Sequence, residues 1–418
     1  MKLALVGADD ETLRLVRALV AGGHELTAVF DAGSYLAQLR QLAPAMRVDE
    51  DWEALLLGSQ LDCAIVARGR ADLSSATGIS ASERREEQLR KLAQSAVPAL
   101  VAHPACEAIV GFEIEMIRRD CQGVLIPYMP GLLQPALQEL AEMADFDEDS
   151  PLGTIEQIVF ERYQADRGRE AVLAQFARDA VLLRKVIGEI HKVSASGPPG
   201  SVQADPLGPK SKIKPNLSNL NVHLVGECDY AARWSVLPPA GEERGSVSWV
   251  GSRGRMSLEM PLAGSPWMLI APQQELLQHG SFHADELVLW SQRLPAMLQG
   301  TIELPLSWID ACRASEAAAA IDRSLERGRT IEQFNEEHTE AESFKGVMAV
   351  GGCLLLAATL GVLFAAAVVE GLQLPLRSSP VWRLWPVFLL APIGVFLLLQ
   401  LLQVVIKRDS PERPRNSV

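Results

Sequence analysis

Hydrophobic and polar positions alternate along the first 130 residues in a pattern typical of a parallel sheet covered by helices. Short apolar runs that suit buried strands are separated by longer segments with a helical spacing of apolar positions. The expected strands cover 2–7, 25–31, 61–68, 98–104 and 123–130, and the expected helices cover 10–23, 49–59 and 82–96. This order predicts a doubly wound α/β domain over 1–130, with its ligand crevice beyond the carboxyl ends of the strands.

The pattern changes in residues 131–330. Here the expected elements are a strand over 154–164, a helix over 169–189 and strand-like segments at 190–197, 221–237, 244–261 and 265–272. Runs of strands after one helix predict an α+β domain with a mostly antiparallel, open sheet. A last helix over 306–328 is a candidate to pack back on the first domain, and an acidic segment over 331–345 follows as a linker.

Two long segments near the end of the chain carry no charged residue. They cover 346–369 and 384–406 and are joined by a loop over 370–383. Helices of 24 and 23 residues extend about 34–36 Å at a rise of about 1.5 Å per residue, enough to cross a hydrocarbon core of about 30 Å. The sequence therefore predicts a transmembrane helical hairpin, with the lipid bilayer as a partner of the protein.

The distribution of charge along the chain indicates on which side of the membrane the body and the tail lie. The tail over 407–418 is basic, whereas the residues before 345 carry the acidic excess behind the formal net charge of −13. The first residues contain no apolar segment of the signal-peptide kind. We therefore expect the large body and the tail on the cytoplasmic side of the inner (cytoplasmic) membrane. An acidic body also disfavours nucleic acid as a partner, and six cysteines without paired spacing suit reduced thiols.

The order of these elements resembles the glucose-fructose oxidoreductase and inositol dehydrogenase family (Gfo/Idh/MocA). The resemblance covers about 1–330, and its most specific parts are the first strand and turn, "DWEALL…LDCAIVA", "ARDAVLLRKVIGEIHKVSA" and "WIDACRASEAAAAIDRSLERGR". It implies a Rossmann domain, a second domain with an open sheet, and NAD or NADP as cofactor. It also implies oxidoreductase chemistry on a sugar or polyol, and homo-oligomers formed through the open sheet.

The turn after the first strand departs from the family pattern. In Gly-x-Gly-x-x-Gly turns, the glycines let the backbone approach a pyrophosphate whose charge rests on the helix N-terminus. Here the six positions read Gly7, Ala8, Asp9, Asp10, Glu11 and Thr12. An aspartate at this place caps the helix, and it repels a diphosphate by about 3 kcal/mol at about 5 Å and an effective dielectric of about 20. We therefore expect the aspartates to fill the phosphate site themselves.

The other family positions also differ in residue type. Asp31, at the end of the second strand, matches the acid that binds an adenosine ribose, but Arg68, Gly69 and Arg70 follow the third strand in place of Thr-Pro. His103 stands in place of the lysine of a Glu-Lys-Pro motif, and Ala174 and Arg178 stand in place of an Asp and a His. The candidate catalytic residues are His103 and Arg178, and the candidate cofactor-binding residues are Gly7, Ala8, Asp9, Asp10, Asp31 and Arg68. An arginine-lined crevice would suit an anionic small-molecule ligand.

Three functions remain open. The first is a non-catalytic descendant, a pseudoenzyme that binds a small ligand or a protein partner, and the joint loss of the phosphate turn and the catalytic residues favours it. The second is a working NAD(P)-dependent oxidoreductase that uses His103 as acid or base near pH 7 and Asp31 for the ribose. The third is a membrane scaffold assembled through the open sheet. No metal site is expected, because neither His103 with Cys106 nor His279 with His283 completes a ligand set.

Overall fold

The computed structural model describes residues 1–49, 51–56, 61–68, 81–95, 97–137, 152–197, 216–227, 230–262, 265–270, 285–333, 355, 357–369, 371–372 and 390. The chain divides into two compact units, Met1–Phe334 and Asn335–Ser417. The first unit contains both predicted sheets, and the second contains the two segments predicted to span a membrane.

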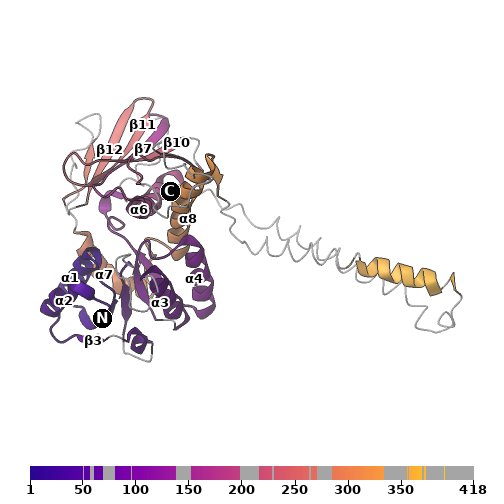
Figure 1. Ribbon diagram of the computed structural model, residues 1–418, viewed down its shortest axis with the longest axis horizontal. Helices are drawn as coiled ribbons and strands as arrows, with labels where there is room; N and C mark the ends of the chain where they lie inside the picture. Colours follow the sequence, from indigo (N-terminus) through magenta and orange to yellow (C-terminus); the bar gives the residue numbers. More distant parts are fainter. Residues whose placement is uncertain are drawn as a thin grey trace, which may run out of the picture. The chain divides into compact units, whose positions relative to one another are not determined.

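A six-stranded parallel sheet forms one lobe of the first unit (Figure 1). Its strands are β1 (Lys2–Val6), β2 (Glu25–Phe30), β3 (Arg47–Asp49), β4 (Cys63–Val66), β5 (Ala99–Ala102) and β6 (Leu125–Tyr128). They lie in the order β3-β2-β1-β4-β5-β6, with parallel neighbours throughout. The doubly wound sheet predicted from the sequence is confirmed. Its parallel order brings the carboxyl ends of all these strands to one edge, where ligands bind in such folds.

Helices cover both faces of this sheet, because successive side chains of a strand point to opposite faces. Leu3 and Leu5 pack in one cluster with α1 (Asp10–Ala21) and α7 (Glu286–Leu298). Ala4 and Val6 pack on the other side with α3 (Ala81–Ser95) and α4 (Ala108–Cys121). The connections after β2 and β3 contain η1 (Gly33–Tyr35), α2 (Leu36–Leu42) and η2 (Trp52–Leu55).

An eight-stranded mixed sheet forms the second lobe (Figure 1). Its strands are β7 (Ile155–Tyr163), β8 (Lys192–Ser196), β9 (Asn221–Val225), β10 (Ala231–Leu237), β11 (Arg244–Gly251), β12 (Gly254–Pro261), β13 (Met268–Ile270) and β14 (Ile331–Glu332). The order is β13-β12-β11-β7-β10-β9-β8-β14. Among the described strand pairs β7 and β10 are parallel and the others antiparallel, which confirms the mostly antiparallel sheet. Helix α6 (Arg169–Ile187) packs on it through the edge-to-face contact of Phe176 with Trp234.

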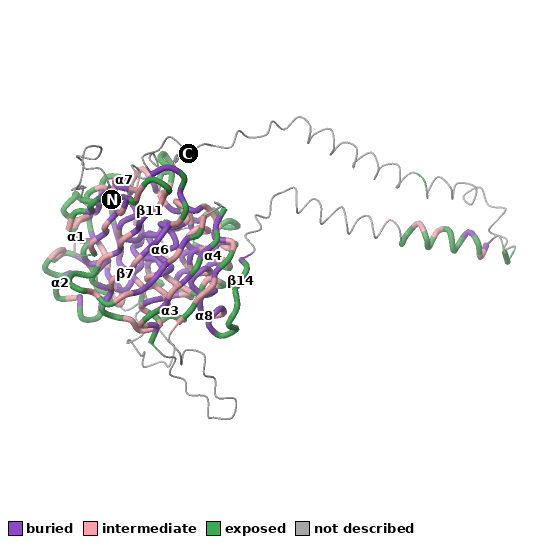
Figure 2. The backbone as a smooth tube through the Cα atoms, turned by 90° about the horizontal axis from the view of Figure 1, so that it is seen from above, coloured by how far each residue is buried: buried purple, intermediate pink, exposed green. Residues whose placement is uncertain are grey.

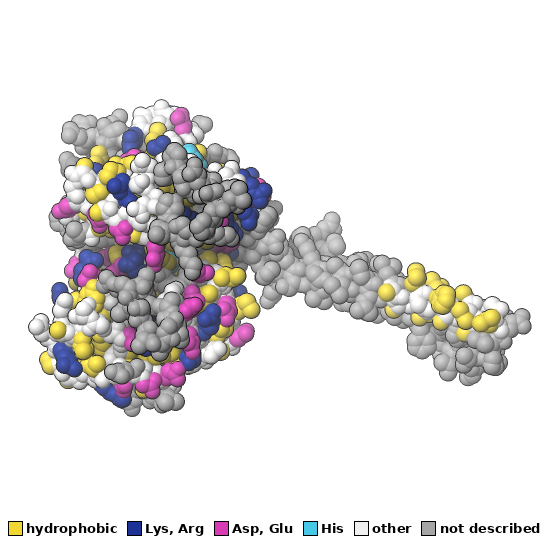
Figure 3. Space-filling view, viewed as in Figure 1, with side chains coloured by type: hydrophobic (Ala, Val, Ile, Leu, Met, Phe, Trp, Pro, Cys, Tyr) yellow, Lys and Arg dark blue, Asp and Glu magenta, His cyan; other side chains and the backbone are white. Residues whose placement is uncertain are grey.

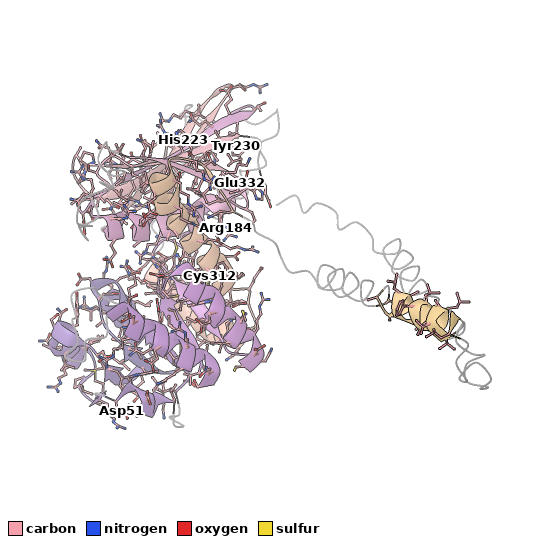
Figure 4. All side chains as sticks on the ribbon, turned by 45° about the vertical axis from the view of Figure 1, so that its right-hand side comes forward. Asp51, Arg184, His223, Tyr230, Cys312 and Glu332 are labelled. Carbon is pink, nitrogen blue, oxygen red and sulfur yellow. The ribbon has the colours of Figure 1, made fainter. Side chains whose placement is uncertain are left out.

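Helix α8 (Trp308–Arg327) contacts both lobes. Trp308 Nε1 donates to Gly111 O of α4 at 3.0 Å, and a Cβ on Gly111 would come within 2.7 Å of Cys312 Sγ. On the other lobe, Arg184 of α6 donates to Asp310 Oδ1 at 3.0 Å. Figure 4 labels Arg184, which belongs to α6, and Cys312, which belongs to α8. The close contact at Gly111 and the ion pair at Arg184 together fix α8 between α4 and α6.

Several elements differ from the sequence expectation. Within the helix expected over 49–59, the described residues Trp52–Leu55 form a short 3-10 helix, η2, capped by Asp51 Oδ1, which accepts from Glu53 N at 3.0 Å. Residues 50 and 57–59 lie outside the described residues. Helices α2, α4 and α7 and strand β3 were not expected. Strand β14 lies at the start of the segment predicted to be a linker and adds an edge strand to the second sheet beside β8.

The described part of the second unit includes a helix over 357–369. Its large apolar side chains are exposed, with Leu360 at 72%, Leu363 at 47% and Phe364 at 71% of full exposure. The helix is mostly green in Figure 2 and largely yellow in Figure 3. Within the described residues, no helix combines the length and hydropathy that a bilayer crossing requires. Most of the predicted spans 346–369 and 384–406, and all of the tail 407–418, lie outside the described residues.

Candidate functional site

The first crossover of the parallel sheet begins at Gly7, whose φ of +76° suits a glycine. Asp9 is the N-cap of α1: its Oδ1 accepts from Thr12 N at 2.7 Å, and Thr12 Oγ1 accepts from Asp9 N at 3.0 Å. This capping box places a carboxylate at the positive end of the helix. The predicted cap is confirmed for Asp9. Asp10, the first helical residue, is exposed, and Ala8 packs partly buried against the core.

The guanidinium of Arg85, from α3, lies against Gly7. A Cβ on Gly7 would come within 2.3 Å of Arg85 Nη2. Arg85 Nη1 donates to Val6 O at 3.1 Å and to Gln88 Oε1 at 2.7 Å. Burial lowers the pKa of Arg85 to about 10, so the group stays charged at neutral pH. Arg85 therefore packs on the glycine that makes the tight turn at the start of the crossover.

Asp31, expected to match a ribose-binding acid, is also engaged by α3. It follows β2 with a φ of +52°. Arg84 Nη2 lies 3.1 Å from Asp31 Oδ1, and Gln88 Nε2 donates to Asp31 Oδ2 at 3.4 Å. The acceptors that a ribose hydroxyl would use are thus shared with two side chains of one helix.

A buried ion cluster joins α1 to the second lobe. Glu11 accepts from Arg178 Nη2 at 2.8 and 2.7 Å and from Arg68 Nη2 at 3.0 Å. Arg178 Nε also donates to His103 O at 2.9 Å, and Arg68 N donates to Asp9 Oδ2 at 3.3 Å. Burial, and secondly the charge of Arg178, lower the pKa of Arg68. The predicted residues Asp9, Arg68, His103 and Arg178 are therefore brought together, and the two arginines meet on Glu11, which was not among the candidates.

His103 does not have the environment that acid or base catalysis near pH 7 needs. The side chain is buried, and its Nε2 lies 3.4 Å from Ala177 O. Burial, followed by the charges of Arg178 and Arg68, lowers the pKa of His103 to about 3. The imidazole is therefore neutral at physiological pH. At this pKa the imidazole carries no proton to donate as an acid near pH 7 and is only a weak base, so this environment does not support the predicted acid or base role of His103.

A cleft of about 960 Å³ opens beside this cluster and is lined by both lobes. The first lobe contributes Glu11, Arg14, Tyr128 and Gln134, and the second contributes Arg162, Gln175, Arg178 and Asp179 among others. Its lining does not include Gly7, Ala8 or Asp31. In Figure 3 acidic and basic side chains lie together at the boundary between the lobes. Among the described residues, the cleft therefore reaches the start of α1 at Glu11 and the second lobe, but not Gly7 or Asp31.

Metal-ligating side chains do not converge in the described part of the chain. No group of three or more His, Cys, Asp or Glu side chains there is placed to hold a metal ion. Cys106 and His103 line the same small cavity next to α8, but burial raises the pKa of Cys106 to about 12, so the group is a thiol. Arg70, His279 and His283 lie outside the described residues.

No protein-family model and no curated protein matches the chain. Solved structures do match its fold. GenD2 from gentamicin A biosynthesis, in complex with NAD, has a TM-score of 0.61 and 15% identity over 80% of this chain and 96% of its own. The WlbA dehydrogenase from Bordetella pertussis, in complex with NADH and UDP-GlcNAcA, has a TM-score of 0.60 and 15% identity. The match covers 80% of this chain and 99% of the dehydrogenase. A putative myo-inositol dehydrogenase from Sinorhizobium meliloti has a TM-score of 0.57 and 14% identity. The match covers 79% of this chain and 99% of that protein.

At these identities the similarity concerns the fold alone. The matched part spans about four fifths of the chain and nearly the whole length of each of these dehydrogenases. The chain therefore shares the two-lobed architecture of these dehydrogenases, which is the fold that the sequence resemblance implied. Nicotinamide dinucleotide binding is consistent with this fold.

Proposed function

We propose that the protein is a catalytically degenerate relative of the Gfo/Idh/MocA dehydrogenases that acts as a ligand-binding or partner-binding body. The observation that carries the proposal is the capping box of Asp9. Its carboxylate stands at the helix N-terminus, at the second-glycine position where the backbone would approach a pyrophosphate. A bound dinucleotide would have to tolerate this charge, at about 3 kcal/mol for a carboxylate about 5 Å away, and to fit beside the guanidinium of Arg85, which packs on Gly7.

The substituted catalytic positions support the same proposal. Hydride transfer to or from a hydroxyl-bearing substrate needs a proton-transfer partner beside the nicotinamide. His103 is buried and neutral, and Arg178 is a guanidinium tied to Glu11. Arginine keeps its proton at physiological pH, so it does not exchange protons with a substrate. Binding, orientation and charge recognition remain available to these residues, and proton transfer does not.

Titration of the full-length protein in detergent with NAD+, NADH, NADP+ and NADPH tests the proposal, with binding followed by calorimetry. We expect no saturation at about 1 mM, which corresponds to a binding free energy weaker than about −4 kcal/mol. A variant carrying Arg85→Ala and Asp9→Ser removes both obstacles while keeping a capping side chain, and we expect it to bind more tightly than the wild type. Micromolar binding by the wild type would overturn the proposal.

We also propose that the body is held at the cytoplasmic face of the inner membrane by a helical hairpin over 346–369 and 384–406. The exposed Leu360, Leu363 and Phe364 support this, because a contiguous apolar helix face needs a partner. Membrane fractionation of the full chain and of a chain ending at residue 334 tests the proposal. We expect only the full chain to resist alkaline extraction, and equal extraction of the two forms would contradict membrane anchoring.

The alternative is an active NAD(P)-dependent oxidoreductase with a rearranged crossover. Its supporting observation is the fold shared with dehydrogenases crystallised with NAD or NADH. It requires that Arg85 and Arg84 leave Gly7 and Asp31 when the cofactor binds. Turnover of a sugar or polyol that disappears in Asp31→Ala would favour this alternative over the first proposal.

A further inference from the structure

We infer that the cleft between the lobes binds a hydroxylated carboxylate, whose carboxylate group is held by Arg162 and Arg178. The inference rests on the proposed function, because it names the chemical class of ligand for the same non-catalytic body. Both arginines line the cleft of about 960 Å³.

Arg162 of β7 is 3% exposed, and only part of its guanidinium is paired. Its Nε donates to Asp179 Oδ2 at 3.0 Å, and its Nη2 donates to Asp179 Oδ1. Within the described part of the chain, Arg162 Nη1 has no hydrogen-bond partner. Buried polar groups in native proteins are almost always paired, so this N–H group calls for an acceptor that the chain does not supply. A carboxylate in the cleft is such an acceptor.

Asp179 is too fully engaged to supply that acceptor. Besides Arg162, it accepts from Trp234 Nε1 at 2.9 Å and from Gln175 Nε2 at 3.0 Å. These bonds orient the carboxylate and hold the guanidinium of Arg162 in place beside the cleft. A pre-positioned charged donor adds affinity because little conformational entropy is lost on binding.

Arg178 offers a second donor. Its Nη2 and Nε are used by Glu11 and by His103 O, and no described residue accepts from its Nη1. Arg68 also pairs with Glu11. Within the described residues, Arg162 and Arg178 thus each keep an N–H group for which the chain supplies no acceptor.

The rest of the cleft lining favours hydroxyl groups and disfavours a second negative charge. Gln134 Oε1, from the first lobe, is a buried acceptor without a partner among the described residues, so a ligand hydroxyl can donate to it. Glu286 is already engaged, because it accepts from Gly131 N at 2.7 Å and Leu133 N at 3.1 Å. The exposed Glu242 and Glu243 line the cleft on the second lobe, where Glu243 Oε1 accepts from Ala165 N near the end of β7, and they would repel a second anionic group.

Three probes with one hexose ring test the inference: D-glucose, D-glucuronate and D-glucose 6-phosphate differ only at the sixth carbon. Calorimetry on the full-length protein in detergent measures each affinity. We expect glucuronate to bind at least about tenfold more tightly than glucose, and glucose 6-phosphate to bind more weakly than glucuronate because of its extra charge. Equal binding of glucose, tighter binding of the phosphate, or no binding of glucuronate at about 10 mM would overturn the inference.

Two variants and a control assign the binding to the arginines. Arg178→Gln and the double variant Arg162→Gln with Asp179→Asn should each weaken glucuronate binding at least about tenfold. The double change avoids leaving Asp179 as an unpaired buried charge, which would unfold the chain. Arg255→Gln, outside the cleft, should leave binding unchanged, and thermal unfolding verifies that each variant is folded.

Unchanged glucuronate affinity in both cleft variants would overturn the assignment. The dinucleotide titration is independent of this test. Dinucleotide binding together with glucuronate binding would overturn only the proposed lack of cofactor. If neither the dinucleotides nor glucuronate binds, only the inferred ligand is overturned.

Discussion

Arg85 covers the backbone at Gly7: a methyl group in place of the glycine hydrogen would stand 2.3 Å from Arg85 Nη2. The two residues lie 78 positions apart, and the guanidinium is fixed by bonds to Val6 O and Gln88 Oε1. The glycine that makes the tight turn at the start of the crossover therefore also leaves room for the guanidinium of Arg85.

The capping role of Asp9 makes a stability prediction. Asp9→Ala removes the acceptor for Thr12 N at 2.7 Å and should lower the free energy of unfolding by about 1 kcal/mol. Asp9→Ser retains a capping oxygen and should cost less than half as much. The midpoint of thermal unfolding measures both changes. Asp10→Ala is the matched control, since Asp10 is exposed, and a larger loss there than at Asp9 would contradict the assigned cap.

The pairing of Glu11 predicts a larger effect. Glu11→Gln leaves Arg178 and Arg68 without a carboxylate inside the interface of the lobes and should cost about 3 kcal/mol or more. Glu113→Gln is the control, because Glu113 pairs with Arg90 at the surface with 51% of its side chain exposed, and such pairs contribute about 1 kcal/mol or less. Urea unfolding measures the difference, and equal losses would show that the buried cluster does not hold the lobes together.

The fold was predictable where local patterns are strong. Buried strands such as β4 and β5, and the amphipathic helix α1, each follow the expected spacing of apolar residues. Helix α7 was missed because it contains Pro295, which normally ends a helix, and it is stabilised by Trp290 packing on Tyr128. Helix α4 was missed because Gly111 interrupts it, and that glycine is needed for the close approach of Cys312. In both cases tertiary contacts outweigh local propensity.

The site was predictable only in part. The N-cap role of Asp9 could be predicted from local sequence, because the aspartate stands directly before the expected helix. The partners of Glu11 could not, because Arg178 reaches it from a helix 167 positions away. The sequence did not indicate a role for Arg162 either. A buried arginine in a strand is recognised only when its partner, here Asp179, is known to lie beside it. Long charged side chains meet through tertiary packing, which spacing along the chain does not encode.

The proposed membrane hairpin predicts that charge on its apolar face is costly. Leu360 is 72% exposed on the helix over 357–369, near the middle of the segment expected to cross the bilayer. Leu360→Arg should disfavour insertion by about 3 kcal/mol and move protein from the membrane fraction to the alkaline extract. Val48→Arg is the control, because Val48 is 41% exposed on β3 of the body. Equal extraction of the two variants would argue against a spanning role for this helix.

The buried imidazole of His103 predicts a pH dependence of stability. Its pKa falls from 6.5 to about 3 on burial, so between these values the unfolded chain binds a proton that the folded chain does not. Stability is therefore fully present above about pH 6.5 and is lost as the pH falls. From pH 7.5 to pH 5, this group should remove about 2 kcal/mol of the free energy of unfolding. His103→Asn keeps a donor for Ala177 O and should reduce that loss, as measured by urea unfolding at each pH. The same pH dependence in wild type and variant would mean that His103 is not buried in its neutral form, and its acid or base role would become available again.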